Sequence, residues 1–273
     1  TIKSGIQTKE QVFGLIRNLN DTADIYLAIQ DPGDNYWKDK PDIRKFIKEL
    51  KLFQIKQTNS LFLSAIKNLN NDQFAKLARI CSVVSFRYNV IGGFNPNIQE
   101  DIYNSVALKI ASSKNFSFQD FQGIYVDDST FKNAFSVKEF KSTTRNHKIV
   151  KYLLEKIEKQ NFNNEIDPES DLFTIEHILP ENADDGWGEF TFDEINRSVY
   201  RIGNLTLLER KLNQQGEQKR YSEKIKLYAK SQSELTRSIP FHYHSWDESK
   251  LAARQTELAK YAGFIWKIQE LSK

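Results

Sequence analysis

A glutamate and a histidine stand side by side in the sequence EHILP, as Glu176 and His177, at the end of a short β-prone run. Two asparagines follow, Asn204 within the sequence GNLTLL and Asn213 nine residues later. A histidine with its ordinary pKa of about 6.5 can take a proton from water, which is worth typically 10²- to 10⁴-fold in rate. Carboxylate and amide oxygens are ligands that hard divalent cations prefer. Together these residue types are what hydrolysis of a phosphodiester with one metal ion requires.

Each of these side chains has an expected role. We expect His177 to be the general base, and Glu176 and Asn213 to be metal ligands. Glu217 lies four residues after Asn213, hence on the same face if a helix has begun there, and is a candidate third ligand. We expect the Asn204 amide to hydrogen-bond across the intervening loop and hold the backbone around His177. Neighbouring side chains of a regular strand point to opposite sides, so Glu176 and His177 converge only if the strand is distorted.

The elements that would position these residues are short. Two β-prone runs cover 172–175 and 202–208, and helical spacing returns over about 217–230 and 248–269. Before them, apolar residues recur at spacings of three and four, with breaks at turn sequences. A polar stretch at 160–170 marks a domain boundary. The sequence therefore predicts a mainly α chain, with a helical bundle over 1–165 and an α+β domain over 166–273 built on a hairpin and a helix.

Charge is nearly balanced over the whole chain but not locally. The 39 basic and 36 acidic side chains give a net charge of +3, too small to indicate a nucleic-acid partner by itself. The segment 209–230, however, holds seven basic residues against three acidic ones. Taken alone, such a segment is typical of a solvated helix face with i,i+4 ion pairs. Beside the expected nuclease site, five of its residues are instead predicted to contact DNA phosphates: Arg210, Lys211, Lys219, Arg220 and Lys224. Phosphate contacts carry no base information, so cleavage by this domain should be nearly sequence-blind.

Several classes of protein are excluded or disfavoured. No run of 18 apolar residues and no secretory signal is present, and the lone Cys81 can build neither a disulfide framework nor a multi-cysteine zinc site. These features favour a cytoplasmic protein without membrane contact. No GxxxxGK[ST] sequence occurs, so any dependence on a nucleoside triphosphate must reside outside this chain.

Two other groupings are weaker candidates for a site. His242 and His244 offer two imidazoles without a third ligand nearby. Asp127, followed by Glu139 and Lys141, mimics the spacing of another nuclease class, but no core strand pattern surrounds these residues. A turn and a helix surface explain them better.

The residues of the first grouping resemble a known family. Their His-Asn-Asn order resembles the HNH, or ββα-metal, nuclease finger. More closely, TIEHILP, RIGNLTLLERKLN and YSEKIKLYAKS resemble the HNH half of GmrSD-type modification-dependent restriction enzymes, over about residues 173–268. The helical half, especially residues 78–110, is similar to the region that links such nuclease domains to an N-terminal ParB-like NTPase module, as in SspE-type nucleases. We expect that module to be missing from this sequence.

The resemblance implies metal-dependent nicking or cleavage of double-stranded DNA in defence against phage. It assigns Glu176 and Asn213 to the metal, His177 to proton abstraction and Asn204 to a structural role. The interval of 27 residues from His177 to Asn204 implies an inserted loop over the site, at about 181–197. Classical members have histidine where Asn213 stands, which favours Mg²⁺ or Mn²⁺ over zinc. The alternative hypothesis is a catalytically silent DNA-binding or scaffold module of a larger defence protein.

Overall fold

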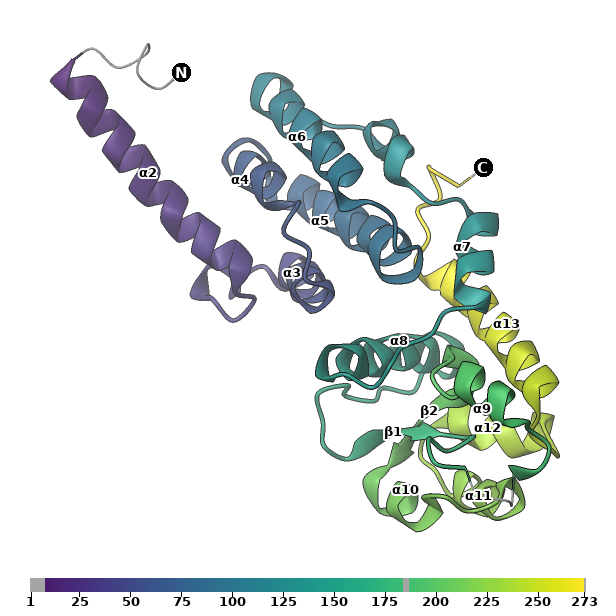
Figure 1. Cartoon of the computed structure of the whole chain (residues 1–273). Helices are drawn as coiled ribbons and strands as arrows, with labels where there is room; N and C mark the ends of the chain where they lie inside the picture. Colours follow the sequence, from purple (N-terminus) through teal and green to yellow (C-terminus); the bar gives the residue numbers. More distant parts are fainter. Residues whose placement is uncertain (1–7, 184–186, 273) are drawn as a thin grey trace. The chain divides into compact units, whose positions relative to one another are not determined.

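The chain folds into two compact units, seen in a computed structural model that describes residues 8–183 and 187–272 (Figure 1). One unit comprises the described chain up to Tyr125 together with Ile268–Leu271, and the other comprises Val126–Lys267. Helices predominate in both, and a single two-stranded sheet is present among the described residues. The prediction of a mainly α fold is confirmed.

The first unit is a bundle of helices. They are α2 (Lys9–Gln30), α3 (Pro41–Phe53), α4 (Asn59–Asn68), α5 (Asn71–Ser85) and α6 (Pro96–Ser113), with the short turns η1 (Asn35–Trp37), η2 (Phe86–Ile91) and η3 (Phe118–Ile124). Helix α3 packs on α5, and α4 packs on α6. Bulky aromatic side chains fill the core, where the Phe62 and Phe74 rings meet edge to face with centroids 5.2 Å apart.

The second unit joins a small sheet to helices. Its elements are α7 (Asp128–Ser136), α8 (Thr144–Phe162), β1 (Phe173–His177), α9 (Phe192–Ser198), η5 (Ile202–Asn204), β2 (Leu205–Glu209), α10 (Arg210–Gly216), α11 (Tyr221–Tyr228), α12 (Glu234–His242) and α13 (Glu248–Ile265). The strands are antiparallel, with Phe173 opposite Glu209 and His177 opposite Leu205. Helix α10 follows β2 without a loop and packs on both strands. The predicted hairpin and helix are thus present.

The two strands differ slightly from the β-prone runs in the sequence. Residues 202–204 form a 3₁₀ turn instead of strand, because Asn204 N donates to Arg201 O at 2.8 Å. Strand β2 is buried along its whole length, since α8 and α12 pack against it. The sequence LTLL suits a strand covered on both faces, because its three leucines are apolar and the buried Thr206 hydroxyl has a hydrogen-bond partner in Thr236.

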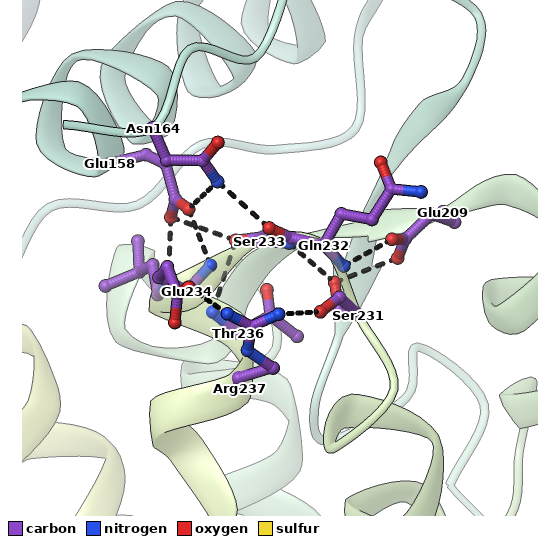
Figure 2. A network of polar contacts seen from close by, with 10 residues as sticks. Glu158, Asn164, Glu209, Ser231, Gln232, Ser233, Glu234, Thr236 and Arg237 are labelled. Atoms are coloured by element: carbon purple, nitrogen blue, oxygen red, sulfur yellow. Dashed lines mark hydrogen bonds and ion pairs between the residues drawn. The ribbon is translucent and has the colours of Figure 1, made fainter. Parts of the chain in front are cut away.

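The units divide at 125/126, earlier than the boundary placed at residue 165 from composition. The reason is α8, which packs on β1, β2, α12 and α13. Figure 2 shows one of these links: the Glu158 carboxylate of α8 accepts hydrogen bonds from the backbone nitrogens of Glu234 and Leu235 at the start of α12, at 2.6 and 2.8 Å. Ser233 Oγ and Asn164 Nδ2 also donate to this carboxylate. Helix α8 therefore belongs to the unit that holds the sheet.

Within residues 8–183 and 187–272, no helix combines the length and the apolar run needed to cross a bilayer.

Candidate active site

His177 is the last residue of β1 and lies in a partly open environment. Its side chain is 17% exposed, and its Nε2 lies 3.5 Å from Glu181 Oε1. The Tyr200 ring meets the imidazole edge to face, with centroids 6.0 Å apart. Burial lowers the pKa of His177 to about 4, although the Glu181 carboxylate opposes this shift. The imidazole is therefore neutral at pH 7 and able to accept a proton.

Asn204 is fully buried and fixes the chain that follows His177. Its Nδ2 donates to the backbone oxygens of Leu179 and Val199, at 2.8 and 3.0 Å. Its Oδ1 accepts from Leu179 N at 2.8 Å and from Trp246 Nε1 at 3.2 Å. Because both ends of the amide bond to Leu179, the backbone two residues after His177 is held against β2. This is the geometry that the expected structural role of Asn204 requires.

Glu176 precedes His177 but lies on the other side of β1. Its side chain is 4% exposed, and its Oε1 accepts from Lys224 Nζ at 2.7 Å and from Tyr228 OH at 2.8 Å. Burial raises the pKa of Glu176 and lowers the pKa of Lys224, and the attraction between the two charges opposes both shifts. The strand pairs regularly through His177, without the distortion needed to bring Glu176 and His177 together.

The Lys224 ammonium contacts both Glu176, through its carboxylate, and His177, through its backbone carbonyl. Besides Glu176, it donates to the carbonyl oxygen of His177 at 2.7 Å. The prediction that Lys224 contacts DNA phosphates does not fit this position, because the side chain is 0% exposed and already satisfied by two acceptors. Lys224 belongs to the interior of the domain.

Asn213 and Glu217 lie at different parts of α10. The Asn213 Nδ2 donates to Thr174 Oγ1 and Ile175 O, at 2.9 and 3.0 Å, and so ties the helix to β1. Helix α10 ends at Gly216, and Glu217 follows as its exposed C-cap with a positive φ of 29°. The expectation that Asn213 and Glu217 share one helix face therefore fails, because the helix does not continue to Glu217.

The remaining predicted DNA-contacting residues are exposed. Arg210 pairs with Asp171 at 3.2 Å, and Lys211 lies beside it at the start of α10. Lys219 and Arg220 line a pocket of about 450 Å³ between α10 and α11, together with Glu217. Gly216 also lines this pocket, and a Cβ added there would lie 3.9 Å from Glu176 Oε1. The pocket therefore lies close to the buried carboxylate.

The predicted inserted loop over 181–197 contains α9, while residues 184–186 lie outside the described part of the chain.

Residues 125–261 match the family of GmrSD restriction endonucleases, C-terminal domain. The match covers 137 of 273 residues and nearly coincides with the second unit, Val126–Lys267. The chain belongs to this family. Membership indicates a function of the restriction-endonuclease type. No curated protein matches the chain.

Two oxygen donors of this GmrSD-family domain are suited to a divalent cation. Among the described residues, no three His, Cys, Asp or Glu side chains lie close enough together to hold a metal ion. Glu176 uses only Oε1 toward described residues, and the Asn213 Oδ1 accepts from none of them. Mg²⁺ commonly takes one or two protein carboxylates and completes its shell with water and substrate phosphate. The Glu176 carboxylate, however, is 4% exposed and already paired with the Lys224 ammonium.

Sequence reasoning missed Glu181 and Tyr228, which contact the two central side chains of this GmrSD-family domain. Glu181 comes four residues after His177, beyond the end of the strand, and nothing in that spacing points to a contact. The sequence does contain a pattern that predicts Tyr228 on the inner face of a helix. Tyr221, Ile225 and Tyr228 recur at spacings of four and three on α11, and Lys224 falls within that stripe.

Proposed function

We propose that this chain is a metal-dependent DNA endonuclease of the HNH, or ββα-metal, type, with His177 as its general base. The observation that carries the proposal is the place of His177: a largely buried imidazole, 17% exposed, at the end of β1 in a hairpin that runs directly into α10. Burial keeps this imidazole neutral at pH 7, and the Glu181 carboxylate favours the protonated form that accepting a proton creates. Its place on a hairpin followed by α10 is what the family resemblance predicts for the base of such a nuclease.

In the proposed reaction, His177 takes a proton from a water molecule whose oxygen attacks the phosphorus. The bond from phosphorus to the leaving oxygen breaks, and that oxygen takes a proton from solvent. Glu181, 3.5 Å from Nε2, orients the ring and balances the positive charge that the imidazole gains. Asn204 keeps the backbone after His177 fixed, so the ring needs little reorganisation.

Glu176 and Asn213 are the residues proposed to hold Mg²⁺ or Mn²⁺, which requires the Lys224 ammonium to release the Glu176 carboxylate. A divalent cation there supplies charge that stabilises the negative phosphate as the bond breaks. We leave Glu217 out of this ligand set, because it caps the end of α10 instead of continuing its face. Arg210, Lys211, Lys219 and Arg220 are proposed to contact phosphates of double-stranded DNA.

The family match supports a proposal for the biological setting. We propose that the chain acts in the cytoplasm in modification-dependent restriction of phage DNA, and that a ParB-like NTPase module of the full-length protein reports the target. Cleavage by the domain itself should be nearly sequence-blind, because its basic side chains can reach phosphates but carry no base information.

One observation favours the alternative of a catalytically silent module. The Glu176 carboxylate is already neutralised by Lys224, as in a domain that uses this pair for stability alone. A silent member would bind DNA through the same exposed basic residues without cutting it.

Incubation with supercoiled plasmid in Mg²⁺ or Mn²⁺ separates the two functions. We expect wild type to convert the plasmid to open circle or linear DNA, and His177→Ala to lose this activity. His244→Ala is the matched control, since His244 is exposed in the same unit. Equal products from wild type and His177→Ala, or none from any variant, would support the silent module.

A further inference from the structure

The segment 138–151, which leads into α8, carries an excess of positive charge. It holds five basic residues, Lys138, Lys141, Arg145, Lys148 and Lys151, against the single acidic Glu139. Lys141, Arg145 and Lys148 are exposed, as is His147 between them. Neither Lys141 nor Lys148 makes an ion pair with a described residue, unlike Arg210 and Lys224 in the other basic segment. The ammonium groups of Lys141 and Lys148 are therefore available to a partner.

A chain of contacts connects this segment to His177. Residue Tyr200, whose ring meets the His177 imidazole, accepts a hydrogen bond at its carbonyl oxygen from Phe140 N at 2.8 Å. Glu139 forms an antiparallel bridge with Arg201, one residue further on. Two residues after Phe140, Ser142 Oγ lies 2.8 Å from His147 Nε2. The first turn of α8 is thus attached to the same backbone that packs against the candidate base.

Electrostatics agree with this placement. Burial is the main cause that lowers the pKa of His177, and Lys224 and His147 lower it further while Glu181 raises it. His147 is therefore within electrostatic reach of His177.

We infer that Lys141, Arg145, His147 and Lys148 form a phosphate-binding surface that holds the DNA strand cut at His177. The inference rests on the proposed function and adds a second contact region to the basic residues of α10 and the α10–α11 loop. Lysine ammonium groups bind phosphates as point charges, and the arginine fork can bind two phosphate oxygens at once. Double-stranded DNA is the partner whose regularly spaced phosphates match several exposed cations within one short segment.

A charge-neutralising variant tests the surface. The variant Lys141→Gln, Arg145→Gln, Lys148→Gln is compared with Lys9→Gln, Lys38→Gln, Lys56→Gln, which removes the same charge from exposed positions of the first unit. Both are made in the His177→Ala background, and binding to a labelled DNA duplex is measured in EDTA over a range of salt. Log K falls as log salt rises, and each lost phosphate contact makes this fall shallower by about 0.9. We therefore expect the slope of the first variant to be shallower by about 2–3. The control should keep the parent slope.

A charge-conserving variant and a second duplex complete the test. Lys141→Arg, Arg145→Lys, Lys148→Arg should retain the parent slope, and an unrelated DNA sequence should give the same losses. Equal slopes for the neutralised variant and its control would overturn the inference. So would a loss of binding that is seen with an RNA duplex of the same length but not with DNA. Because binding is measured without catalysis, failure of the proposed function appears separately, as wild-type protein that binds DNA but leaves the plasmid supercoiled.

Discussion

The two sides of strand β1 place adjacent residues in opposite environments. His177 is 17% exposed beside the partly exposed Glu181, whereas the Glu176 carboxyl is 4% exposed and engages Lys224 and Tyr228. One side presents a neutral base with access to solvent, and the other holds a pair of charges in the interior. The two-residue period of a strand is enough to separate a group suited to chemistry from a group suited to holding the domain together.

Replacement of Lys224 by methionine should have the largest effect on stability. The variant Lys224→Met leaves the buried Glu176 carboxylate without its cation, and breaking such a pair typically costs roughly 3–5 kcal/mol. Urea unfolding followed by tryptophan fluorescence measures the change. The exposed Lys226→Met on the same helix is the control and should shift stability by less than about 0.5 kcal/mol.

Adding the substitution Glu176→Gln tests whether the loss of stability in Lys224→Met comes from an unpaired buried charge. The double variant Lys224→Met, Glu176→Gln should recover most of the loss, because no unpaired charge then remains buried. A Lys224→Met protein as stable as wild type would show that Glu176 is not confined as described.

The pH dependence of stability tests the His177 side. Because the folded pKa of about 4 lies below the ordinary value of 6.5, the unfolded chain binds more protons between these two pH values. Stability should therefore fall as pH is lowered from about 6.5 toward 4, by up to about 3 kcal/mol from this group. His177→Gln should remove that part of the dependence, whereas the exposed His244→Gln should leave it in place. An unchanged profile in His177→Gln would mean that the imidazole is not held in its neutral form.

Removal of the Glu181 charge should have the smallest effect. Glu181 is 39% exposed and its attraction to His177 is screened by solvent, so Glu181→Gln should change stability by less than about 1 kcal/mol. Its charge raises the pKa of His177, so the titration of the His177 ring, followed by NMR, should move to lower pH in the variant. Movement to higher pH would contradict the assigned contact.

Much of the fold follows from local sequence patterns, but the domain division does not. The β-prone run at 172–175 and the apolar LTLL sequence predict the two strands, and helical spacing predicts α11 and α13. The polar stretch 160–170 resembles a linker because a polar composition indicates that a segment is exposed. It does not indicate which unit the neighbouring helix packs on. Helix α8 joins the second unit through packing on β1, β2, α12 and α13, and one of these links is the Glu158 carboxylate, whose partner Leu235 is 77 residues away in sequence. Such a contact leaves no local pattern.

The sequence predicts which residues belong to the candidate site better than it predicts how their side chains are arranged. The EHILP and GNLTLL sequences identify His177 and Asn204, and both lie where they act on the same loop. The place of Lys224 in the basic segment 209–230 predicts a contact with DNA phosphates, which its buried position contradicts. Its place among Tyr221, Ile225 and Tyr228 is the sign that it lies on the inner face, where a carboxylate on β1 receives it. Spacing alone cannot tell which of two charged residues finds a buried partner.

The rate of plasmid nicking by His177→Gly, with and without added imidazole in Mg²⁺, tests the role of His177 as a base most directly. Deleting a general base should slow nicking by roughly 10²- to 10⁴-fold, and free imidazole should restore part of the rate by taking the proton in its place. Nicking by His177→Gly at the wild-type rate, or a loss that no concentration of imidazole relieves, would contradict the assignment.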